Sequence, residues 1–383
     1  MPMKKMIKDS LKMLMQEGIL PKLYKYYENK TEIEKGRVLF ADSNHKGLSK
    51  EMKAIYMALK KRGYKTEVYS GDIRKMDPAT VFRFMKTFMK KYARAEYVFI
   101  SNYFVPVSAC DKREGTKVIQ LWHAAGALKK MGFDAEDDIA KYYKGNPVKN
   151  FDLVTVSSDY CRQFFESAFK LTDKEVKATG IARTDEYFSK RQNDKKIENF
   201  YFRYPQAKGK KICLYAPSFS GNASAPECKG LDAGIIETMN KLKDEWFFLV
   251  SLHPHLRKLY PEYNMDISTE DMFPVCDLLI TDYSSVVFDY SLYKKSMLFF
   301  VPDLKEYEEQ RGFYNSIETF PGKIVKNSDD LYDILISGEW KCDEDELKCF
   351  KDKYMAACDG HASIRILKEA GLLKEEENGK EFY

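Results

Sequence analysis

The stretch Cys276-Asp277-Leu278-Leu279-Ile280-Thr281-Asp282-Tyr283-Ser284-Ser285 decides the fold class. An apolar run typical of a buried strand ends in an acid and two hydroxyls, and a helical segment begins at Val286. Ser284 or Ser285 is therefore expected to cap a helix N-terminus. Free backbone N–H groups and the positive end of the helix dipole bind phosphate at such a place. An ordinary strand, turn and capped helix fits the same residues, so the decision rests on the rest of the chain.

Short apolar runs alternate with amphipathic stretches over most of the 383 residues. This alternation predicts parallel sheets covered by helices, and hence an α/β protein. The length suits two domains of ordinary size. The expected strands are 37–41, 66–70, 97–101, 116–121, 153–157, 176–179, 211–215, 246–252, 276–281 and 296–301. The expected helices include 50–62, 160–169, 230–244 and 286–294.

The polar, charged segment 189–211 predicts the boundary between the two domains. We expect four parts: an amphipathic, membrane-associating segment at 1–30, a first α/β domain at 31–190, a second at 191–345, and a helical segment at 346–383. The last segment is expected to pack back on the first domain.

Composition excludes several classes of protein. No run of about 18 apolar residues occurs, so no membrane-spanning helix is expected, and no secretory signal is apparent. Eight cysteines without metal-ligand spacing indicate reduced thiols of a cytoplasmic protein. No nucleic-acid-binding motif accompanies the basic residues, so no nucleic-acid partner is expected.

Positive charge gathers in two amphipathic segments. Residues 1–30 carry seven lysines against three acids, with Leu11 and Leu14 among apolar residues at helical spacing. Residues 80–97 combine an apolar face with five basic residues that have no acid among them. Both patterns suit the surface of an anionic membrane. The alternative is that each helix packs on its own domain and leaves a solvated basic face.

The unusual polar residues fall where strands end. His123, His253, Asp282 and the pair Pro217-Ser218 each follow an expected strand, and the chain has only five histidines. Open α/β sheets bind ligands beyond the carboxyl ends of their strands. These residues are therefore the first candidates for a site.

His123 is a candidate general base, because an imidazole with a pKa near neutrality can take a proton from a hydroxyl nucleophile. The residues after it predict a tight turn and then a helix, in which Gly126 permits close backbone approach and Lys129 or Lys130 faces phosphate. The alternative is a structural histidine bonded to a nearby carbonyl.

His253 and Arg183 are candidates for contacts to phosphate. A histidine stabilises charge that develops during phosphoryl transfer, and a guanidinium binds two phosphate oxygens at once. Zinc is not expected, because His253 and His255 point to opposite sides of an extended chain and no third ligand follows. For Arg183, an ion pair between domains is the alternative. No ATP P-loop, dinucleotide fingerprint or GxSxG elbow is present.

Together these motifs resemble the CDP-glycerol glycerophosphotransferase family, which builds wall teichoic acid in Gram-positive bacteria. The resemblance covers roughly residues 95–370. It rests on the stretches QLWHAAGALKKMG (120–132), GIARTD (180–185), YAPS (215–218), HP (253–254), LITDYSSVVFDY (279–290), VPDL (301–304), RGFY (311–314) and CDGHAS (358–363).

The resemblance implies a GT-B-type arrangement: two Rossmann-like domains facing a central cleft, with an N-terminal amphipathic helix. CDP-glycerol would bind chiefly to the second domain, without a metal or other cofactor. By position, His123 matches the family's catalytic base, and His253 matches its second essential histidine, which acts on the diphosphate. The substrate-binding residues expected from it are Gly126, Ala127, Arg183, Pro217, Ser218, Asp282, Tyr283, Ser284, Ser285 and Asp289.

Within this family, His123-Ala124-Ala125-Gly126-Ala127 looks more like a primase, since polymerases commonly have His-Gly-Thr-Pro there. A primase would transfer sn-glycerol 3-phosphate from CDP-glycerol to N-acetylmannosaminyl-N-acetylglucosaminyl-diphospho-undecaprenol and release CMP. It would act as a peripheral protein on the cytoplasmic face of the membrane. The alternatives are a glycerol- or ribitol-phosphate polymerase, a UDP-sugar glycosyltransferase and a non-catalytic membrane adaptor. A homo-oligomer, the donor polyol and the group that removes the acceptor proton (His123, Asp289 or water) are left open.

Overall fold

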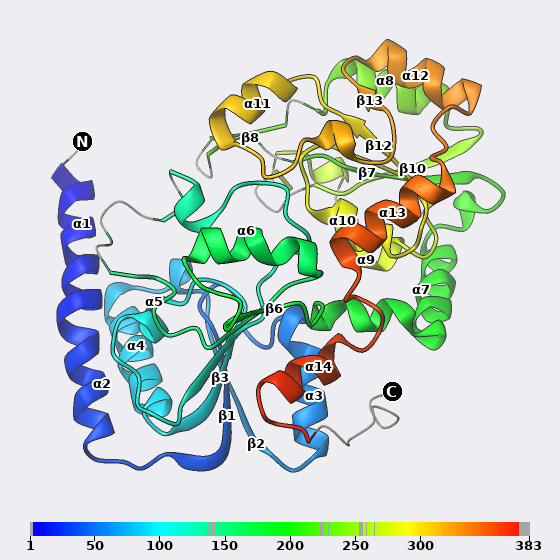
Figure 1. Ribbon diagram of the computed structural model, residues 1–383. Helices are drawn as coiled ribbons and strands as arrows, with labels where there is room; N and C mark the ends of the chain where they lie inside the picture. The colour runs from blue at the N-terminus through cyan, green and yellow to red at the C-terminus, as the bar shows by residue number, and fades with distance from the viewer. Residues whose placement is uncertain are drawn as a thin grey trace. The chain divides into compact units, whose positions relative to one another are not determined.

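The computed structural model describes residues 3–136, 138–139, 143, 145–218, 220–222, 225–228, 230–252, 256–257, 259–263 and 265–374, and it divides into two compact units (Figure 1). Unit 1 comprises Met1–Ala124, Met131–Asp185 and Ala357–Tyr383. Unit 2 comprises Ala125–Lys130 and Glu186–Ala356. A short piece that directly follows His123 and Ala124 is therefore part of unit 2.

Unit 1 is built on a sheet of six strands in the order β2-β1-β3-β4-β5-β6, and every neighbouring pair is parallel. Its strands are β1 (Glu34–Asp42), β2 (Lys65–Ser70), β3 (Ala95–Ile100), β4 (Lys117–Gln120), β5 (Leu153–Thr155) and β6 (Val176–Lys177). Residues 38–41 of β1 are almost completely buried, as in an inner strand covered on both faces. The six strands expected in this part of the sequence are all present.

The helices of unit 1 start and pack where their side chains dictate. They are α1 (Met3–Met13), the π-helix Leu14–Ile19, α2 (Leu20–Glu28), α3 (Lys50–Lys61), α4 (Pro78–Tyr92), α5 (Val105–Ser108), α6 (Asp159–Phe169) and α14 (Ala362–Glu369). Asp77 accepts hydrogen bonds from two backbone N–H groups at the start of α4. In the core, Ile55 and Leu59 of α3 lie in one apolar cluster with Leu367 of α14.

Most of the apolar face of α4 packs within its own unit, although Phe82 is 37% exposed. Phe84, Met85, Phe88 and Met89 are buried in unit 1, and α4 contacts α2 (Figure 1). For this segment, the burial of these residues favours the alternative of packing on its own domain.

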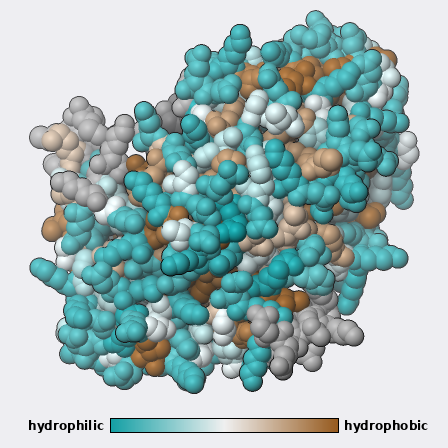
Figure 2. All heavy atoms as spheres, in the orientation of Figure 1, coloured by the Kyte–Doolittle hydropathy of each residue, from teal (hydrophilic) through white to brown (hydrophobic). Residues whose placement is uncertain are grey.

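The N-terminal helices differ from α4 because several of their apolar side chains are exposed. Met6, Leu11 and Leu14 are between 56% and 61% exposed. On the face drawn in Figure 2 the surface is mostly hydrophilic, and some brown and tan atoms lie along the edge where α1 and α2 run. No helix in the described part of the chain is long and apolar enough to cross a membrane.

Unit 2 holds a second parallel sheet, in the order β10-β7-β11-β12-β13. Its strands are β7 (Lys211–Ala216), β10 (Trp246–Val250), β11 (Leu278–Thr281), β12 (Ser296–Phe300) and β13 (Ile324–Val325), and β8 (Ser220–Asn222) pairs with β9 (Ala225–Glu227) in an antiparallel hairpin. The helices are α7 (Lys190–Arg203), α8 (Ala233–Lys241), α9 (Thr269–Met272), α10 (Val286–Ser291), α11 (Leu304–Arg311), α12 (Ser328–Ser337) and α13 (Glu344–Met355). The sequence did not predict β8, β9 or β13, which are only two or three residues long.

The division into two units assigns the expected boundary segment and the expected C-terminal helical segment to particular units. The polar stretch 189–211 contains α7, and the chain passes from unit 1 to unit 2 just before it, between Asp185 and Glu186. Helical residues near the C-terminus form two helices, of which α13 belongs to unit 2 and α14 to unit 1.

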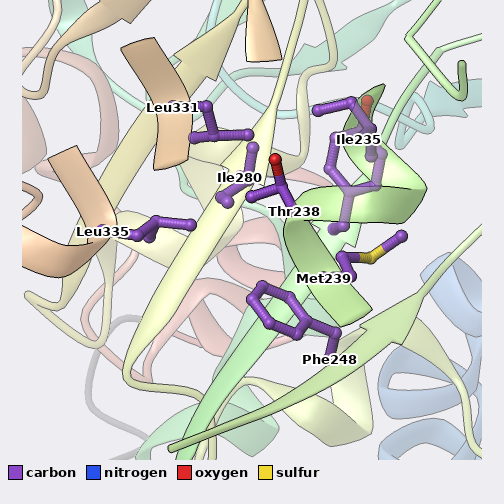
Figure 3. A pocket seen from close by; sticks show the side chains of 8 residues that line it. Ile235, Thr238, Met239, Phe248, Ile280, Leu331 and Leu335 are labelled. Carbon is purple, nitrogen blue, oxygen red and sulfur yellow. The ribbon is translucent and has the colours of Figure 1, made fainter. Parts of the chain in front are cut away.

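A small hollow in unit 2 lies between α8 and α12 above the sheet (Figure 3). It is lined by Tyr215, Ile235, Thr238, Met239, Phe248, Ile280, Leu331 and Leu335. It has room for little more than a water molecule, and none of the described residues that line it is charged. We assign this hollow to core packing rather than to a substrate.

Candidate active site

His123 is held at the carboxyl end of β4 by a strained turn. Trp122, the residue before it, is buried and has φ +54°, a conformation that non-glycine residues rarely adopt. The Trp122 N–H donates to Oε1 of the buried Gln120 (3.0 Å), and the indole packs edge-on against Phe169 with ring centroids 5.1 Å apart. Such strain persists only where surrounding contacts fix the backbone, and it is frequent at functional sites.

The hydrogen bonding of His123 leaves one ring nitrogen available as a base. Nδ1 lies 3.3 Å from the carbonyl oxygen of Ser101. A carbonyl oxygen only accepts, so Nδ1 carries the proton and Nε2 keeps its lone pair. His123 is exposed as a residue, as the base for a bound substrate must be.

The surroundings of His123 keep its imidazole neutral. Desolvation by the protein atoms around it lowers the pKa of His123 below its usual value, although the residue reaches the surface, and the positive charge of Arg183 acts in the same direction. The hydrogen bond to Ser101 and the negative charge of Glu51 oppose this shift. At neutral pH the ring is therefore predominantly the neutral species that a general base requires.

Arg183 belongs to unit 1 and lies near His123 within it. It is only 8% exposed and sits on the 3-10 helix Ala182–Phe188. Two residues later, the buried Asp185 accepts hydrogen bonds from the backbone N–H groups of Ala362 and Ser363, both at 2.8 Å. The GIARTD and CDGHAS stretches therefore meet, and this contact fixes the start of α14 on unit 1.

In unit 2, Ser218 and Asp282 meet at the carboxyl ends of two neighbouring strands. They follow β7 and β11, which pair in parallel, and the buried Pro217 lies between β7 and Ser218. The Ser218 N–H donates to Oδ2 of Asp282 (2.6 Å). The other oxygen, Oδ1, is buried and receives no hydrogen bond from the described residues. Burial raises the pKa of Asp282, whereas Ser218 and the charge of Lys129 oppose the rise.

An aromatic stack lies beside Asp282. The Tyr283 ring stacks on Tyr307 with centroids 3.9 Å apart and lies 5.7 Å from the ring of Phe313. The Tyr283 hydroxyl donates to Oδ1 of Asp303 (2.8 Å), and burial together with this carboxylate raises the pKa of Tyr283. The hydroxyl is thus engaged within unit 2, and the ring helps to shape the surface next to Asp282.

The two serines after Tyr283 differ in their contacts. Ser284 Oγ accepts from the backbone N–H of Val286 at 3.3 Å. Ser285 occupies the N-cap position of α10, but its side chain makes no capping hydrogen bond. Of the two expected caps, only Ser284 is bonded to a helix N–H group. Asp289, on α10, is 5% exposed.

The residues after His123 do not form the expected helix. Gly126 has φ +65°, and a Cβ there would lie 2.3 Å from the ring of Phe288, so close packing explains this glycine. The Ala127 carbonyl accepts from Nδ2 of Asn315, and the Leu128 carbonyl accepts from the Tyr314 N–H, both at 2.8 Å. The expectation failed because these residues pair with a distant segment, 312–315, instead of with one another.

Two expectations lie outside the described residues or stay untested. His253, with Pro254 and His255, is not among the residues that the structure describes. Within the described part, no three His, Cys, Asp or Glu side chains gather in a way that could hold a metal ion. The absence of a metal cofactor remains a prediction.

Sequence reasoning gave no role to Asp303, Tyr307 or Arg311, which lie in or beside stretches of the family pattern. The structure places the Tyr307 ring against the Tyr283 ring. The positive charge of Arg311 contributes to the lowered pKa of Lys129. A role for these residues could have been predicted from their position, because the VPDL and RGFY stretches follow β12, the strand that pairs with β11.

Comparison with known proteins identifies the family. The model of the CDP-Glycerol:Poly(glycerophosphate) glycerophosphotransferase family matches residues 23–370. The chain belongs to this family. It is therefore a transferase, and this membership speaks against the adaptor and the UDP-sugar glycosyltransferase.

Relatives of this family member act in teichoic acid synthesis. The teichoic acid ribitol-phosphate primase of Bacillus spizizenii is 30% identical over 91% of this chain and 94% of its own length. The teichoic acid glycerol-phosphate primase of Bacillus subtilis is 31% identical over 71% of this chain and 72% of its own length. A poly(ribitol-phosphate) polymerase is also 31% identical, but the chain spans about half, 48%, of its length. Among solved structures, the wall teichoic acid polymerase TagF has a TM-score of 0.71 at 20% identity, with 97% of this chain and 99% of that chain covered.

Proposed function

We propose that this protein is a teichoic acid glycerol-phosphate primase. It would transfer sn-glycerol 3-phosphate from CDP-glycerol to the N-acetylmannosaminyl-N-acetylglucosaminyl-diphospho-undecaprenol acceptor and release CMP. The observation that carries the proposal is the His123 site: an exposed imidazole in a family transferase, with Nδ1 bonded to Ser101 and Nε2 available as a base. Ala124 and Ala125 after the histidine favour a primase over a polymerase.

The proposed reaction is an in-line phosphoryl transfer. The acceptor hydroxyl oxygen attacks the phosphorus atom that carries glycerol, while His123 Nε2 takes the hydroxyl proton. The bond between that phosphorus and the bridging oxygen breaks, and CMP leaves with the bonding electron pair. His253 would stabilise charge on the diphosphate, and Arg183 would bind phosphate oxygens.

We further propose that the two units are Rossmann-like domains of a GT-B-type enzyme with a cleft between them. In this proposal unit 2 binds CDP-glycerol at the carboxyl ends of its strands, where Pro217, Ser218, Asp282 and Ser284 lie. Unit 1 presents the base and receives the acceptor.

The acceptor would place the reaction at a membrane, and α1 together with the start of the π-helix that follows it is the proposed contact with its cytoplasmic face. Exposed Met6, Leu11 and Leu14 would enter the headgroup region, while lysines of the same segment meet anionic lipids. Co-sedimentation with vesicles containing anionic lipid tests this: serine at the three apolar positions is expected to abolish binding. Unchanged binding would argue against α1 as the contact.

A ribitol-phosphate primase is the second candidate, since such a primase matches along most of both chains. Turnover with CDP-glycerol, CDP-ribitol and UDP-N-acetylglucosamine on the purified lipid acceptor separates the candidates. The proposal expects CMP release with CDP-glycerol and its loss in His123→Gln. Turnover only with CDP-ribitol would replace the donor, and turnover only with the UDP-sugar would refute the proposed reaction.

A further inference from the structure

The piece Ala125–Lys130 is anchored to unit 2 as an added strand-like segment. Lys129 forms an antiparallel bridge with Phe313, and the backbone N–H of Lys130 donates to the Gly312 carbonyl (3.2 Å). Successive side chains of extended backbone point to opposite sides. Accordingly, Lys129 is partly buried and Lys130 is exposed. This pairing fixes where the Lys129 side chain goes.

The Lys129 ammonium feels the charge of the Asp282 carboxylate but makes no hydrogen bond with the described residues. Its ammonium lies 5.0 Å from the centroid of the Tyr307 ring, a cation–π contact. Burial lowers the pKa of Lys129 to about 8, with the positive charge of Arg311 acting in the same direction and the negative charge of Asp282 opposing both. Among the described residues, no hydrogen bond or ion pair is found for its three N–H donors.

The Asp282 carboxylate, in turn, has one oxygen that accepts no hydrogen bond from the described residues. Its Oδ2 accepts from the Ser218 N–H, but its Oδ1 is buried and accepts from no described group. Buried carboxylate oxygens are normally hydrogen-bonded, so a vacant one at the end of a strand indicates a place for a ligand. A ligand that satisfies both groups needs an anionic oxygen for Lys129 and an O–H group for Asp282.

We propose that Lys129 binds an anionic oxygen of the donor's diphosphate and that Asp282 accepts a hydrogen bond from a hydroxyl of the same donor. The proposal rests on the proposed function, because a CDP-polyol carries both chemical groups. It adds Lys129, from the segment directly after His123, to the donor site at the strand ends of unit 2. Donor binding would then act on the segment that directly follows the base in the chain.

A dependence on pH follows from this assignment. The diphosphate diester of the donor keeps its charge between pH 7 and 10, so Lys129 is the group that titrates in this range. Only the protonated ammonium attracts the anion. The affinity of the free protein for donor should therefore fall as pH rises through about 8.

The test is calorimetric titration of the full chain with CDP-glycerol and with CDP-ribitol, at pH 7 and at pH 9. Lys129→Gln should weaken binding on the order of 10- to 100-fold at pH 7, the loss of one charge-assisted hydrogen bond. Lys130→Gln, the exposed neighbour, is the matched control and should stay within about twofold. Lys129→Arg should retain binding, and its affinity should not decline at pH 9 because arginine keeps its charge there. A lysine with only a structural role would not make the affinity depend on pH in this way.

The outcomes separate this inference from the proposed function. Binding by the unaltered protein together with equal affinity of Lys129→Gln overturns the inference alone. Failure of the unaltered protein to bind either CDP-polyol overturns the proposed function, and the inference with it. Should Lys129→Gln misfold, the pH dependence of the unaltered protein decides: constant affinity between pH 7 and 9 contradicts the assignment.

Discussion

Replacing Asp185 with alanine should destabilise unit 1, because it removes a buried contact with the start of α14. Asp185 is 3% exposed, and its two carboxylate oxygens accept from the backbone N–H groups of Ala362 and Ser363, each at 2.8 Å. Both amides lie at the start of α14, whose Ile366 and Leu367 are buried in the core of unit 1. Asp185→Ala leaves two buried donors without acceptors.

The expected size follows from those two bonds. A buried donor left unsatisfied costs about 1–3 kcal/mol, so two cost about 2–6 kcal/mol. Burial also raises the pKa of Asp185, because the folded state disfavours its ionised form. Replacing this carboxylate removes that cost, so the net loss of stability is smaller than the cost of the two lost hydrogen bonds. We therefore expect a net loss of about 2–4 kcal/mol, equivalent to a melting temperature lower by roughly 5–15 °C for a unit of this size.

Calorimetric melting with hydrogen exchange at Ala362 and Ser363 measures the effect. The matched control is Asp111→Ala, which removes a largely exposed partner of Lys149 in the same unit and should change stability by less than about 1 kcal/mol. Equal melting temperatures for Asp185→Ala and Asp111→Ala, with both amides still protected, would refute the reasoning.

Three further changes test other parts of the account. His123→Gln should lower kcat by roughly 10²- to 10⁴-fold. In the unaltered enzyme, the rate should fall as the pH drops through the pKa of His123, which is lowered from its usual value of about 6.5. The same pH–rate profile in the variant would argue against His123 as the base. Gly126→Ala should destabilise unit 2 by about 2–4 kcal/mol in a denaturant titration, because φ is positive and the new Cβ would lie 2.3 Å from the Phe288 ring. The control is Gly209→Ala, which also has a positive φ but no atom within 4 Å of the new Cβ, and it should cost only about 1 kcal/mol. Tyr24→Phe should cost about 1–3 kcal/mol, because the buried Tyr24 hydroxyl accepts from the Arg113 N–H (2.9 Å); identical denaturation curves for variant and unaltered protein would contradict this.

The regular parts of the fold were predictable from local sequence. Every expected strand is present, because strands of a parallel sheet buried on both faces appear as unbroken apolar runs such as 38–41 or 278–281. Helix starts followed from side-chain caps, as at Asp77. The short strands β8, β9 and β13 were missed because two or three residues carry no periodicity.

Long-range contacts set the limit of the sequence reasoning. The rule that ligands gather at strand ends correctly selected Ser218 and Asp282, which are bonded to each other across two neighbouring strands. Nothing local shows that Leu128 pairs with Tyr314, so residues 125–130 were expected to be helical. The contact of Asp185 with Ala362, 177 residues away, was equally invisible, although both stretches were recognised as family motifs.

The apolar face of α4 illustrates an ambiguity that the sequence left open. Its Phe and Met residues suit a membrane surface and a protein core equally well, because both environments reward the same spacing. Packing against the rest of unit 1 decides for the core, whereas Leu11 and Leu14 in the preceding helical segments remain exposed.

The most direct measurement of the central claim is the mass spectrum of the undecaprenyl-diphosphate-linked disaccharide after incubation with purified protein and excess CDP-glycerol. A primase adds one glycerol phosphate, and the mass should then stay constant at long times. A ladder of additions would show a polymerase and contradict the reading of His123-Ala124-Ala125-Gly126. An unchanged acceptor, with CDP-ribitol consumed instead, would contradict the choice of donor.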